Sequence, residues 1–430
     1  MSNNTQNDVA TSTTLSTGLV VEKDGYKETK LGWIPEDWEV VELGSIGKVI
    51  SGLTYSPNDV VEDGTLVLRS SNIQKGNLKF EDNVYVDTSS LKFREVQEND
   101  ILICVRNGSK NLIGKNTSIT KSLEGVAFGA FMTIYRSALN TFLKHYFKTE
   151  FYQREIHKNL GATINSINGS NLKKFRVPLP PLSEQQKIAS ILNTWDNAIA
   201  AQEKLIAQKQ ALKKGLMQQL LTGKKRFPGF EEEWEEFRLE DVCDVNGKYG
   251  IGAAAVEFSN DLPRYLRITD IDDDGNYSPE KEVSVSEKTW NEYVLEDGDI
   301  VFARTGNTTG KTYLYQEKDG VLVYAGFLIK FRPKSDKLNP NYLKFFTQTE
   351  PYWSWVKTMS VRSGQPGINS KEYGKLKLEL PSIEEQAKIV SLLKTKENEI
   401  SKYQSYVKEL KKQKQGLMQQ LLTGEKRVEI

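Results

Sequence analysis

Two short stretches of the chain carry side chains that are suited to contact DNA, and they occupy matching places in its two halves. Arginine can hydrogen-bond guanine through two donors, asparagine can pair with adenine, and lysine can hold a phosphate. Each stretch follows a short apolar run that begins with Asp-Ile. We therefore predict DNA contacts from Arg106, Asn107, Ser109, Lys110 and Lys115 in the first half, and from Arg304, Thr305, Asn307 and Lys311 in the second.

The two central arginines also have a structural interpretation. Arg106 follows Asp100 by six residues, and Arg304 follows Asp299 by five. An ion pair between each arginine and its aspartate would brace the turn and leave no charge for a ligand. The sequence leaves both interpretations open.

Two further arginines and two loops are weaker candidates for the same surface. Arg69 and Arg267 follow apolar residues at matching positions, so DNA contact and a structural role are both open for them. Residues 161–168 and 363–369 combine glycine with polar neighbours, which is typical of loops that enter a groove and equally of ordinary turns.

These stretches belong to a duplication that extends over most of the chain. The sequence GLMQQLLTG occurs at residues 215–223 and again, 201 residues later, at residues 416–424. Other pairs keep a similar offset, such as Trp38 with Trp234 and Ile167-Asn168 with Ile368-Asn369. A period of about 200 residues indicates two whole domains rather than a solenoid.

Each copy ends in a segment with the spacing of a long helix. Apolar residues recur at alternating steps of four and three, which predicts a coiled-coil seam. Prolines precede both segments, and Gly223 and Gly424 end them. We predict that the helices bind their partners through the apolar seam residues Ile188, Leu192, Trp195, Ile199, Leu216 and Leu220 in the first segment, and Ile389, Leu393, Ile400, Leu417 and Leu421 in the second.

Polar residues interrupt both seams. They are Gln202, Lys209, Lys213, Lys396 and Lys414. Buried polar groups can set the register of a coiled coil. The alternative is that these side chains are solvated and face partner subunits.

The predicted fold class is α+β, with two duplicated mixed α/β domains separated by two long helices. The helices are expected to pair as an antiparallel coiled coil with pseudo-twofold symmetry, which would place the two domains at opposite ends of a spacer. The predicted boundaries are a disordered polar tail at residues 1–25, a first domain at 26–180, a central helix at 181–223, a second domain at 224–380 and a final helix at 381–424.

Composition excludes several classes of protein. The chain has 430 residues, 27% of them charged, and no apolar run of membrane-spanning length, so we expect a protein without a membrane segment. It has two cysteines and no export signal at its start, which favours the cytoplasm. A net charge of +1 requires that any DNA-binding surface be a local patch.

Motifs for catalysis, metals and nucleotides do not hold up in detail. Residues 306–312 resemble a phosphate-binding loop, but only three residues separate its glycines instead of four. Residues 270–275 open like a calcium loop, yet Lys281 stands where the last glutamate is required, so a polar turn is predicted. His145 and His157 are the only histidines, and they suggest neither a zinc site nor a catalytic triad. We predict no catalytic residues, no metal and no cofactor in this chain.

The duplicated order of these motifs, over roughly residues 30–425, resembles the specificity subunit of type I restriction-modification systems. The resemblance rests on the Asp299-Ile300-Val301 run with Arg304, on the similar helix starts near residues 181 and 381, and on the repeated GLMQQLLTG. It implies that each domain recognises one half of an asymmetric bipartite target in double-stranded DNA. It also implies that the helices dock two methyltransferase subunits, that two restriction subunits can join, and that S-adenosylmethionine, ATP and Mg belong to those partners.

Two other functions remain as alternatives. A coiled-coil scaffold without DNA function would ignore DNA sequence and would leave the matched arginine turns unexplained. A self-sufficient DNA methyltransferase or endonuclease would need a cofactor site. The sequence shows no glycine-rich loop after a strand that would supply one.

Overall fold

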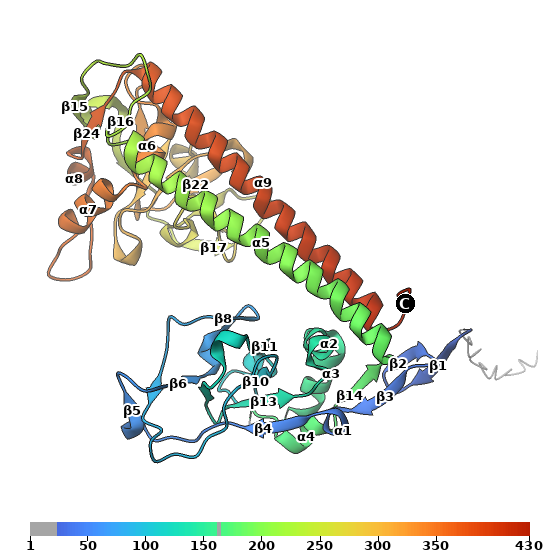
Figure 1. Cartoon of the computed structure of the whole chain (residues 1–430). Coiled ribbons are helices and arrows are strands. Elements are labelled where there is room, and N and C mark those ends of the chain that lie inside the picture. The colour runs from blue at the N-terminus through green and yellow to red at the C-terminus, as the bar shows by residue number, and fades with distance from the viewer. Residues whose placement is uncertain (1–23, 161–164) are drawn as a thin grey trace, which may run out of the picture. The chain divides into compact units, whose positions relative to one another are not determined.

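The computed structural model describes residues 24–160 and 165–430, which form two compact units (Figure 1). The first unit consists of the described residues up to 200 together with residues 408–430, and the second consists of residues 201–407. Each unit therefore contains one α/β domain and one part of each long helix. The predicted tail lies outside the described residues except at its last two positions.

The first unit is built on two four-stranded sheets, in the orders β11-β10-β13-β4 and β12-β6-β9-β5. The first sheet is antiparallel, and β12 pairs parallel to β6 in the second. Its strands are β1 (Tyr26–Thr29), β2 (Gly32–Pro35), β3 (Glu39–Glu42), β4 (Lys48–Ser51), β5 (Val60–Val61), β6 (Thr65–Leu68), β7 (Ile73–Gln74), β8 (Asn77–Leu78), β9 (Tyr85–Val86), β10 (Ile101–Cys104), β11 (Asn116–Ser118), β12 (Ala127–Phe128), β13 (Met132–Arg136) and β14 (Arg176–Leu179). Its short helices are α1 (Leu43–Ile46), α2 (Asn140–Tyr146), α3 (Glu150–Asn159) and α4 (Gly169–Lys173).

The second unit repeats this plan, with the sheets β16-β23-β20-β21 and β17-β19-β18-β22. Here β18 and β22 are the parallel pair. Its strands are β15 (Glu235–Arg238), β16 (Cys243–Tyr249), β17 (Ala255–Glu257), β18 (Arg264–Leu266), β19 (Val283–Val285), β20 (Ile300–Ala303), β21 (Thr312–Leu314), β22 (Leu322–Tyr324), β23 (Leu328–Pro333) and β24 (Lys377–Leu380). Its short helices are α6 (Pro340–Phe346), α7 (Glu350–Met359) and α8 (Ser370–Gly374). The predicted duplication is thus confirmed at the level of strand order.

Strands β10 and β20, which lie inside the two antiparallel sheets, are apolar on both faces, because both faces are covered. All four residues of β10 and all four of β20 are buried. On one face of β10, an aromatic cluster fills the space toward the helices, with the rings of Phe147 and Tyr152 5.0 Å apart at their centroids. The opposite face packs on a second core that includes Leu102 and Phe128. This packing fixes where β10 and β20 end, and the candidate DNA-contact turns begin there.

The two predicted long helices are present as α5 (Leu182–Leu220) and α9 (Ile383–Leu422). In each unit, a part of α5 lies antiparallel to a part of α9. The order of the contacts shows this: Lys209 meets Glu399 and Lys213 meets Glu397 in the second unit. In the first unit Glu184 meets Arg427 and Asp196 meets Lys414. The fold class is therefore as predicted. No helix within residues 24–160 and 165–430 combines the length and the apolar character needed to cross a lipid bilayer.

Lysines at the polar seam positions form ion pairs between the two helices. Lys209 donates a hydrogen bond to Glu399, Lys213 to Glu397 and Lys414 to Asp196. The hydrogen bond from Lys209 lowers the pKa of Glu399 below its ordinary value. These pairs require one alignment of the helices, which supports the register interpretation. Of the other two polar positions, Lys396 pairs with Glu399 on its own helix, and Gln202 is half-buried.

The apolar seam residues have their partners inside the chain. Ile188, Leu192 and Leu421 are buried in the core of the first unit, and Leu220, Ile389 and Leu393 in that of the second. Ile199 and Ile400 are also buried, while Trp195, Leu216 and Leu417 are half-buried. These side chains hold helix to helix and helix to domain. Of the residues predicted to bind a partner, Trp195, Leu216 and Leu417 keep part of their surface exposed, and any further partner contact would involve other residues of the helices.

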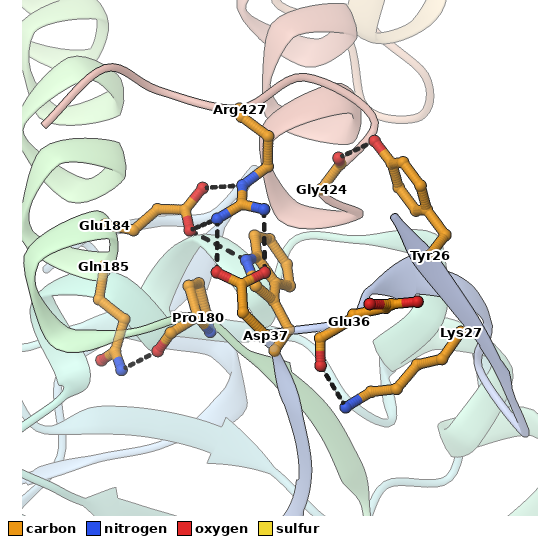
Figure 2. A network of polar contacts seen from close by, with 10 residues as sticks. Tyr26, Lys27, Glu36, Asp37, Pro180, Glu184, Gln185, Gly424 and Arg427 are labelled. Atoms are coloured by element: carbon orange, nitrogen blue, oxygen red, sulfur yellow. Dashed lines mark hydrogen bonds and ion pairs between the residues drawn. The ribbon is translucent and has the colours of Figure 1, made fainter. Parts of the chain in front are cut away.

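The ends of the helices are held by an arginine–glutamate contact that occurs once in each unit. Figure 2 shows the first, in which Arg427, just after α9, reaches Glu184 at the start of α5 and also Asp37. The Glu184 carboxylate is fully buried and also accepts a hydrogen bond from Trp38 Nε1 at 2.9 Å. The hydrogen bonds that Arg427 donates to Glu184 and Asp37 raise the pKa of Arg427 above its ordinary value.

The second unit repeats the contact with different support. Arg226, just after α5, donates to both oxygens of the buried Glu385 at the start of α9, at 3.1 and 2.7 Å. Trp234, the counterpart of Trp38, makes no hydrogen bond through its Nε1 within the described part of the chain. Arg226 therefore carries the whole interaction with this carboxylate, whereas Arg427 shares it with a tryptophan.

A buried histidine predicts a pH dependence that is confined to the first unit. His145 in α2 is fully buried beside the Lys414–Asp196 ion pair, and its counterpart in α6 is Phe345. Burial, followed by the charges of Lys414, Lys144 and Lys148, lowers the pKa of His145 from 6.5 to about 3, although Asp196 opposes this.

Because the folded-state pKa lies below the unfolded value, protonation favours the unfolded chain. This contribution to stability is complete above pH 6.5 and is lost as the pH falls from 6.5 toward 3, by up to about 1.4 kcal/mol per pH unit. We expect His145→Phe to flatten the fall in the melting temperature of the first unit between pH 7 and pH 5. His157→Phe, at an exposed position, is the matched control and should leave the slope unchanged. Equal slopes in the wild type and His145→Phe would contradict the assignment.

Candidate nucleic-acid interface

The turn after β10 places Arg106 at the surface of the first unit. The backbone N–H groups of Val105 and Arg106 both donate to the carbonyl of Phe131, at 3.0 and 3.2 Å. Arg106 also forms a single bridge with Ser166, so the loop after α3 lies against this turn. The Arg106 side chain is exposed, and its guanidinium lies 5.9 Å from the centre of the Phe131 ring. The sheet thus fixes the backbone of this arginine and leaves its charged end free.

The other polar candidates of this turn connect it to the loop after β6. Asn107 Nδ2 donates to Ser70 Oγ at 3.0 Å, and Lys115 Nζ donates to the Ser70 carbonyl at 3.1 Å. Lys110 and Ser109 are exposed. The structure therefore brings these candidates to one surface around residue 70, although they are far apart in the sequence.

The turn after β20 repeats this arrangement in the second unit. The Arg304 N–H donates to the Phe327 carbonyl at 3.0 Å, and Thr305 forms a bridge with Gly367. The guanidinium of Arg304 lies 5.0 Å from the ring centre of Tyr249 at the end of β16. Asn307 is exposed. Both halves thus present an arginine beside an aromatic ring at the same place in the fold.

The buried aspartates just before β10 and β20, Asp100 and Asp299, do not pair with the arginines of the following turns. Asp100 accepts two hydrogen bonds from Arg136 of β13, at 2.8 and 2.7 Å. Asp299 accepts from Lys330 Nζ at 3.0 Å and from Arg332 Nε at 2.7 Å, both in β23. The expectation that they pair with Arg106 and Arg304 is wrong, because the neighbouring strand lies closer than the following turn.

Ion pairing separates the candidate cations into two groups. Arg69 pairs with Asp82, Arg267 with Asp270, and Lys311 with Asp273. Arg267 holds the fully buried Asp270 carboxylate through two nitrogens, at 3.0 and 2.7 Å, so its main role is to support the loop after β18. Within the described residues, Arg106 and Arg304 form no ion pair.

The loops that were candidates for groove contacts differ in what can be said of them. Residues 161–164 lie outside the described part, whereas Asn165 donates from Nδ2 to the Gly108 carbonyl at 2.8 Å. Residues 361–366 are exposed throughout, and the Pro366 carbonyl accepts from the Gly306 N–H at 3.0 Å. Each loop therefore borders the arginine turn of its own unit.

The calcium-like stretch is a polar turn, as predicted. Asp272 Oδ1 accepts from the N–H groups of Asp274 and Asn276, at 3.0 and 2.8 Å, and Gly275 takes a positive φ of 73°. The carboxylate oxygen therefore completes the turn. The neighbouring Asp273 pairs with Lys311 at 2.7 Å and reduces the charge available there.

The sequence did not single out three aromatic residues of these surfaces. They are Phe131 and Phe327, whose carbonyls anchor the arginine turns, and Tyr249, which lies under Arg304. The matched tetrapeptides at residues 128–131 and 324–327 were a usable signal, but a strand pattern alone does not show that its last ring is exposed.

Comparisons with known proteins agree with this duplicated plan. A model of the type I restriction modification DNA specificity domain matches residues 35–209 and residues 231–409. The type I restriction enzyme EcoKI specificity subunit of Escherichia coli strain K12 is 27% identical over 388 residues, which cover 84% of this chain and 82% of that protein. The MjaVIII specificity subunit of Methanocaldococcus jannaschii is 26% identical over 432 residues, or 94% of this chain and 97% of that protein.

Two solved structures share the fold. One, from work on complex assembly and conformational transition of the type I R-M system, has a TM-score of 0.55 at 18% identity and covers 91% of this chain and 99% of its own. The S subunit from M. genitalium has a TM-score of 0.52 at 17% identity, with 90% and 96% covered. Because the family model matches both halves and most of the sequence, this chain belongs to the type I restriction modification DNA specificity family.

Proposed function

We propose that this chain is the non-catalytic, sequence-reading subunit of a type I restriction-modification complex. In this proposal the domain at residues 26–180 reads one half of a bipartite DNA target, and the domain at residues 224–380 reads the other. The long helices, with predicted limits of 181–223 and 381–424, bind two methyltransferase subunits and, where present, restriction subunits. Because the two domains differ in sequence, the two half-sites differ as well.

The observation that carries the proposal is the pair of unneutralised arginines at equivalent turns. A guanidinium at the surface, without a carboxylate partner, is free to hydrogen-bond a guanine edge or a phosphate. Each of Arg106 and Arg304 is held by backbone hydrogen bonds in a sheet, so its position is set before DNA binds. Asn107, Lys110 and Lys115 in one unit, and Thr305, Asn307 and Lys311 in the other, surround these arginines as further contacts.

Arg69 and Arg267 have a smaller part in this proposal. Both are paired with carboxylates, and each lies at the start of a loop that borders the reading surface. We assign them to holding those loops, with phosphate contact through the remaining guanidinium N–H groups. Their removal should weaken DNA binding without changing the sequence that is read.

The chemistry is assigned to the partner subunits. We propose that methyltransferase subunits bound to the helices modify an adenine in each half-site, which has to leave the base stack to be reached. S-adenosylmethionine, ATP and Mg would be bound by those subunits. This work takes place on double-stranded DNA in the cytoplasm, where the two free cysteines, Cys104 and Cys243, stay reduced.

The test is a genome-wide map of methylated adenines in cells that express this chain with its methyltransferase subunit. We expect an asymmetric two-part motif with a fixed gap, which disappears when only this chain is removed. Arg304→Ala should lose discrimination in one half of the motif, and Arg106→Ala in the other, by roughly 10- to 100-fold per contacted base.

Two exposed arginines outside the turns provide matched controls. Arg154→Ala in α3 and Arg238→Ala in β15 should leave the motif unchanged. A methylation pattern that is the same with and without this chain would refute the proposed function. A motif that stays intact in both Arg106→Ala and Arg304→Ala would place the reading surface elsewhere in the domains.

A further inference from the structure

Two phenylalanines at equivalent positions are exposed although other large apolar residues close to them in sequence are buried. The exposed fractions of Phe131 and Phe327 are 57% and 58%. In the first unit the exposed fractions of Phe128 and Met132 are both 1%. In the second unit the corresponding neighbours, at positions 324 and 328, are fully buried. In both units the exposed ring thus lies between a buried aromatic residue three positions before it and a buried residue directly after it, while Ala130 is exposed and Gly326 half-buried.

The backbone holds each ring outward in the same way. The Met132 N–H donates to the Gly129 carbonyl at 2.8 Å, and the Leu328 N–H donates to the Ala325 carbonyl at 2.8 Å, which closes a tight turn around each phenylalanine. The phenylalanine carbonyl then accepts the N–H of Arg106 or Arg304. The backbone of each phenylalanine is thus fixed beside the arginine of its own unit.

A single exposed apolar side chain needs no explanation, since folded proteins expose many. An exposed phenylalanine at the same place in both units does need an explanation, because the sequences around the two turns have diverged. The tetrapeptides themselves differ at three of four positions, and only the last residue is phenylalanine in both. Leaving such a ring in water gives up burial that is worth about 25 cal/mol per Å². A ligand that covers the ring would recover this contribution.

We propose that Phe131 and Phe327 are base-contacting residues, one for each half of the DNA target. This inference rests on the proposed function of the chain. The ring makes apolar contact with the bases, either with the methyl group of a thymine or with a base face at an opened step. The arginine beside it supplies the polar contact to the same half-site. In the second unit Tyr249, which is 40% exposed, extends the apolar surface.

DNA fits this surface because the turn of each phenylalanine adjoins an arginine that forms no ion pair within the described residues. A polyanion is attracted to such a charge, while base edges offer the apolar methyl groups and faces that the ring needs. In the first unit the guanidinium of Arg106 lies 5.9 Å from the ring centre of Phe131, so one nucleotide step can contact both groups.

The test uses Phe131→Ala and Phe327→Ala in the complex with the methyltransferase subunit, on duplexes that carry the mapped motif. We expect each variant to bind the motif about tenfold more weakly or worse, with the loss confined to its own half-site. Binding to unrelated DNA should stay within twofold, because it depends on phosphate contacts. Replacing single thymines by uracil should mimic the loss if a methyl group is read. 2-Aminopurine beside the site should brighten with the wild type, and not with the variant, if a step is opened.

Val60→Ala and Val321→Ala are the matched controls, since these residues lie outside the long helices and have exposed fractions of 45% and 54%. They should bind the motif as the wild type does, and all four variants should keep the wild-type melting temperature. Wild-type affinity in both phenylalanine variants would overturn the inference, as would loss of the methyltransferase subunit from them. If the wild-type complex itself fails to prefer the motif, the proposed function fails together with the inference. If the wild-type complex prefers the motif and both phenylalanine variants bind the motif as tightly as the wild type, the inference fails and the proposed function stands.

Discussion

Asp299→Ala is expected to lower the free energy of unfolding of the second unit by about 3–5 kcal/mol. The Asp299 carboxylate is fully buried and holds both Lys330 and Arg332. Lys330 is only 6% exposed, so the substitution leaves an ammonium group buried without a counter-charge. The change should be measured by urea unfolding, with hydrogen exchange of β20 and β23 to assign the loss to this unit.

The first unit provides the matched control for this prediction. Within the described residues, the one cation that pairs with Asp100 is Arg136, which is 29% exposed and also donates to the Glu95 carbonyl. The position that matches Lys330 is Ile134. We expect Asp100→Ala to cost less, about 1–3 kcal/mol.

Replacing the lysine as well separates the charge from the carboxylate. Asp299→Ala combined with Lys330→Ile should recover much of the loss, because isoleucine is the residue that the first unit tolerates there. Equal losses in the two aspartate variants, or no recovery in the double variant, would contradict the argument.

Arg226→Ala is expected to destabilise the second unit more than Arg427→Ala destabilises the first. In both cases a fully buried glutamate loses its cation. Glu184 keeps the hydrogen bond from Trp38, whereas no other side chain in the described residues donates to Glu385. For Arg427→Ala we expect a cost toward the lower end of about 1–3 kcal/mol, because its guanidinium is 42% exposed and already screened by water.

The hydrogen bond from Trp38 explains why Arg427→Ala should cost less than Arg226→Ala, so removing this hydrogen bond should make the two losses equal. Trp38→Phe combined with Arg427→Ala should reach the larger loss of Arg226→Ala. Hydrogen exchange at the first turns of α5 and α9 measures both effects in one sample. If Arg427→Ala proves the more damaging single change, the hydrogen bond from Trp38 does not hold the buried carboxylate.

Some features of the candidate site could be predicted from local sequence, and others could not. The turns with Arg106 and Arg304 could be found from the sequence, because each follows a short apolar strand and repeats at a similar offset. The ion-pair partners of Asp100 and of Asp299 could not be found from the sequence, because they depend on which strand lies next to β10 and β20 in the sheet. A strand order is set by contacts between residues about 30 positions apart, and no local pattern encodes them.

By itself, the sequence determined the duplication, the two long helices and the α+β class. These features are periodic or local, so residue spacing reports them directly. Only the tertiary structure decided that Lys209, Lys213 and Lys414 align the helices, and that most residues of the apolar seam are buried within the chain. It alone showed that Phe131 and Phe327 are exposed next to arginines that form no ion pair within the described residues. Exposure and ion pairing depend on which distant segments meet, and hydrophobic collapse selects those contacts over the whole domain at once.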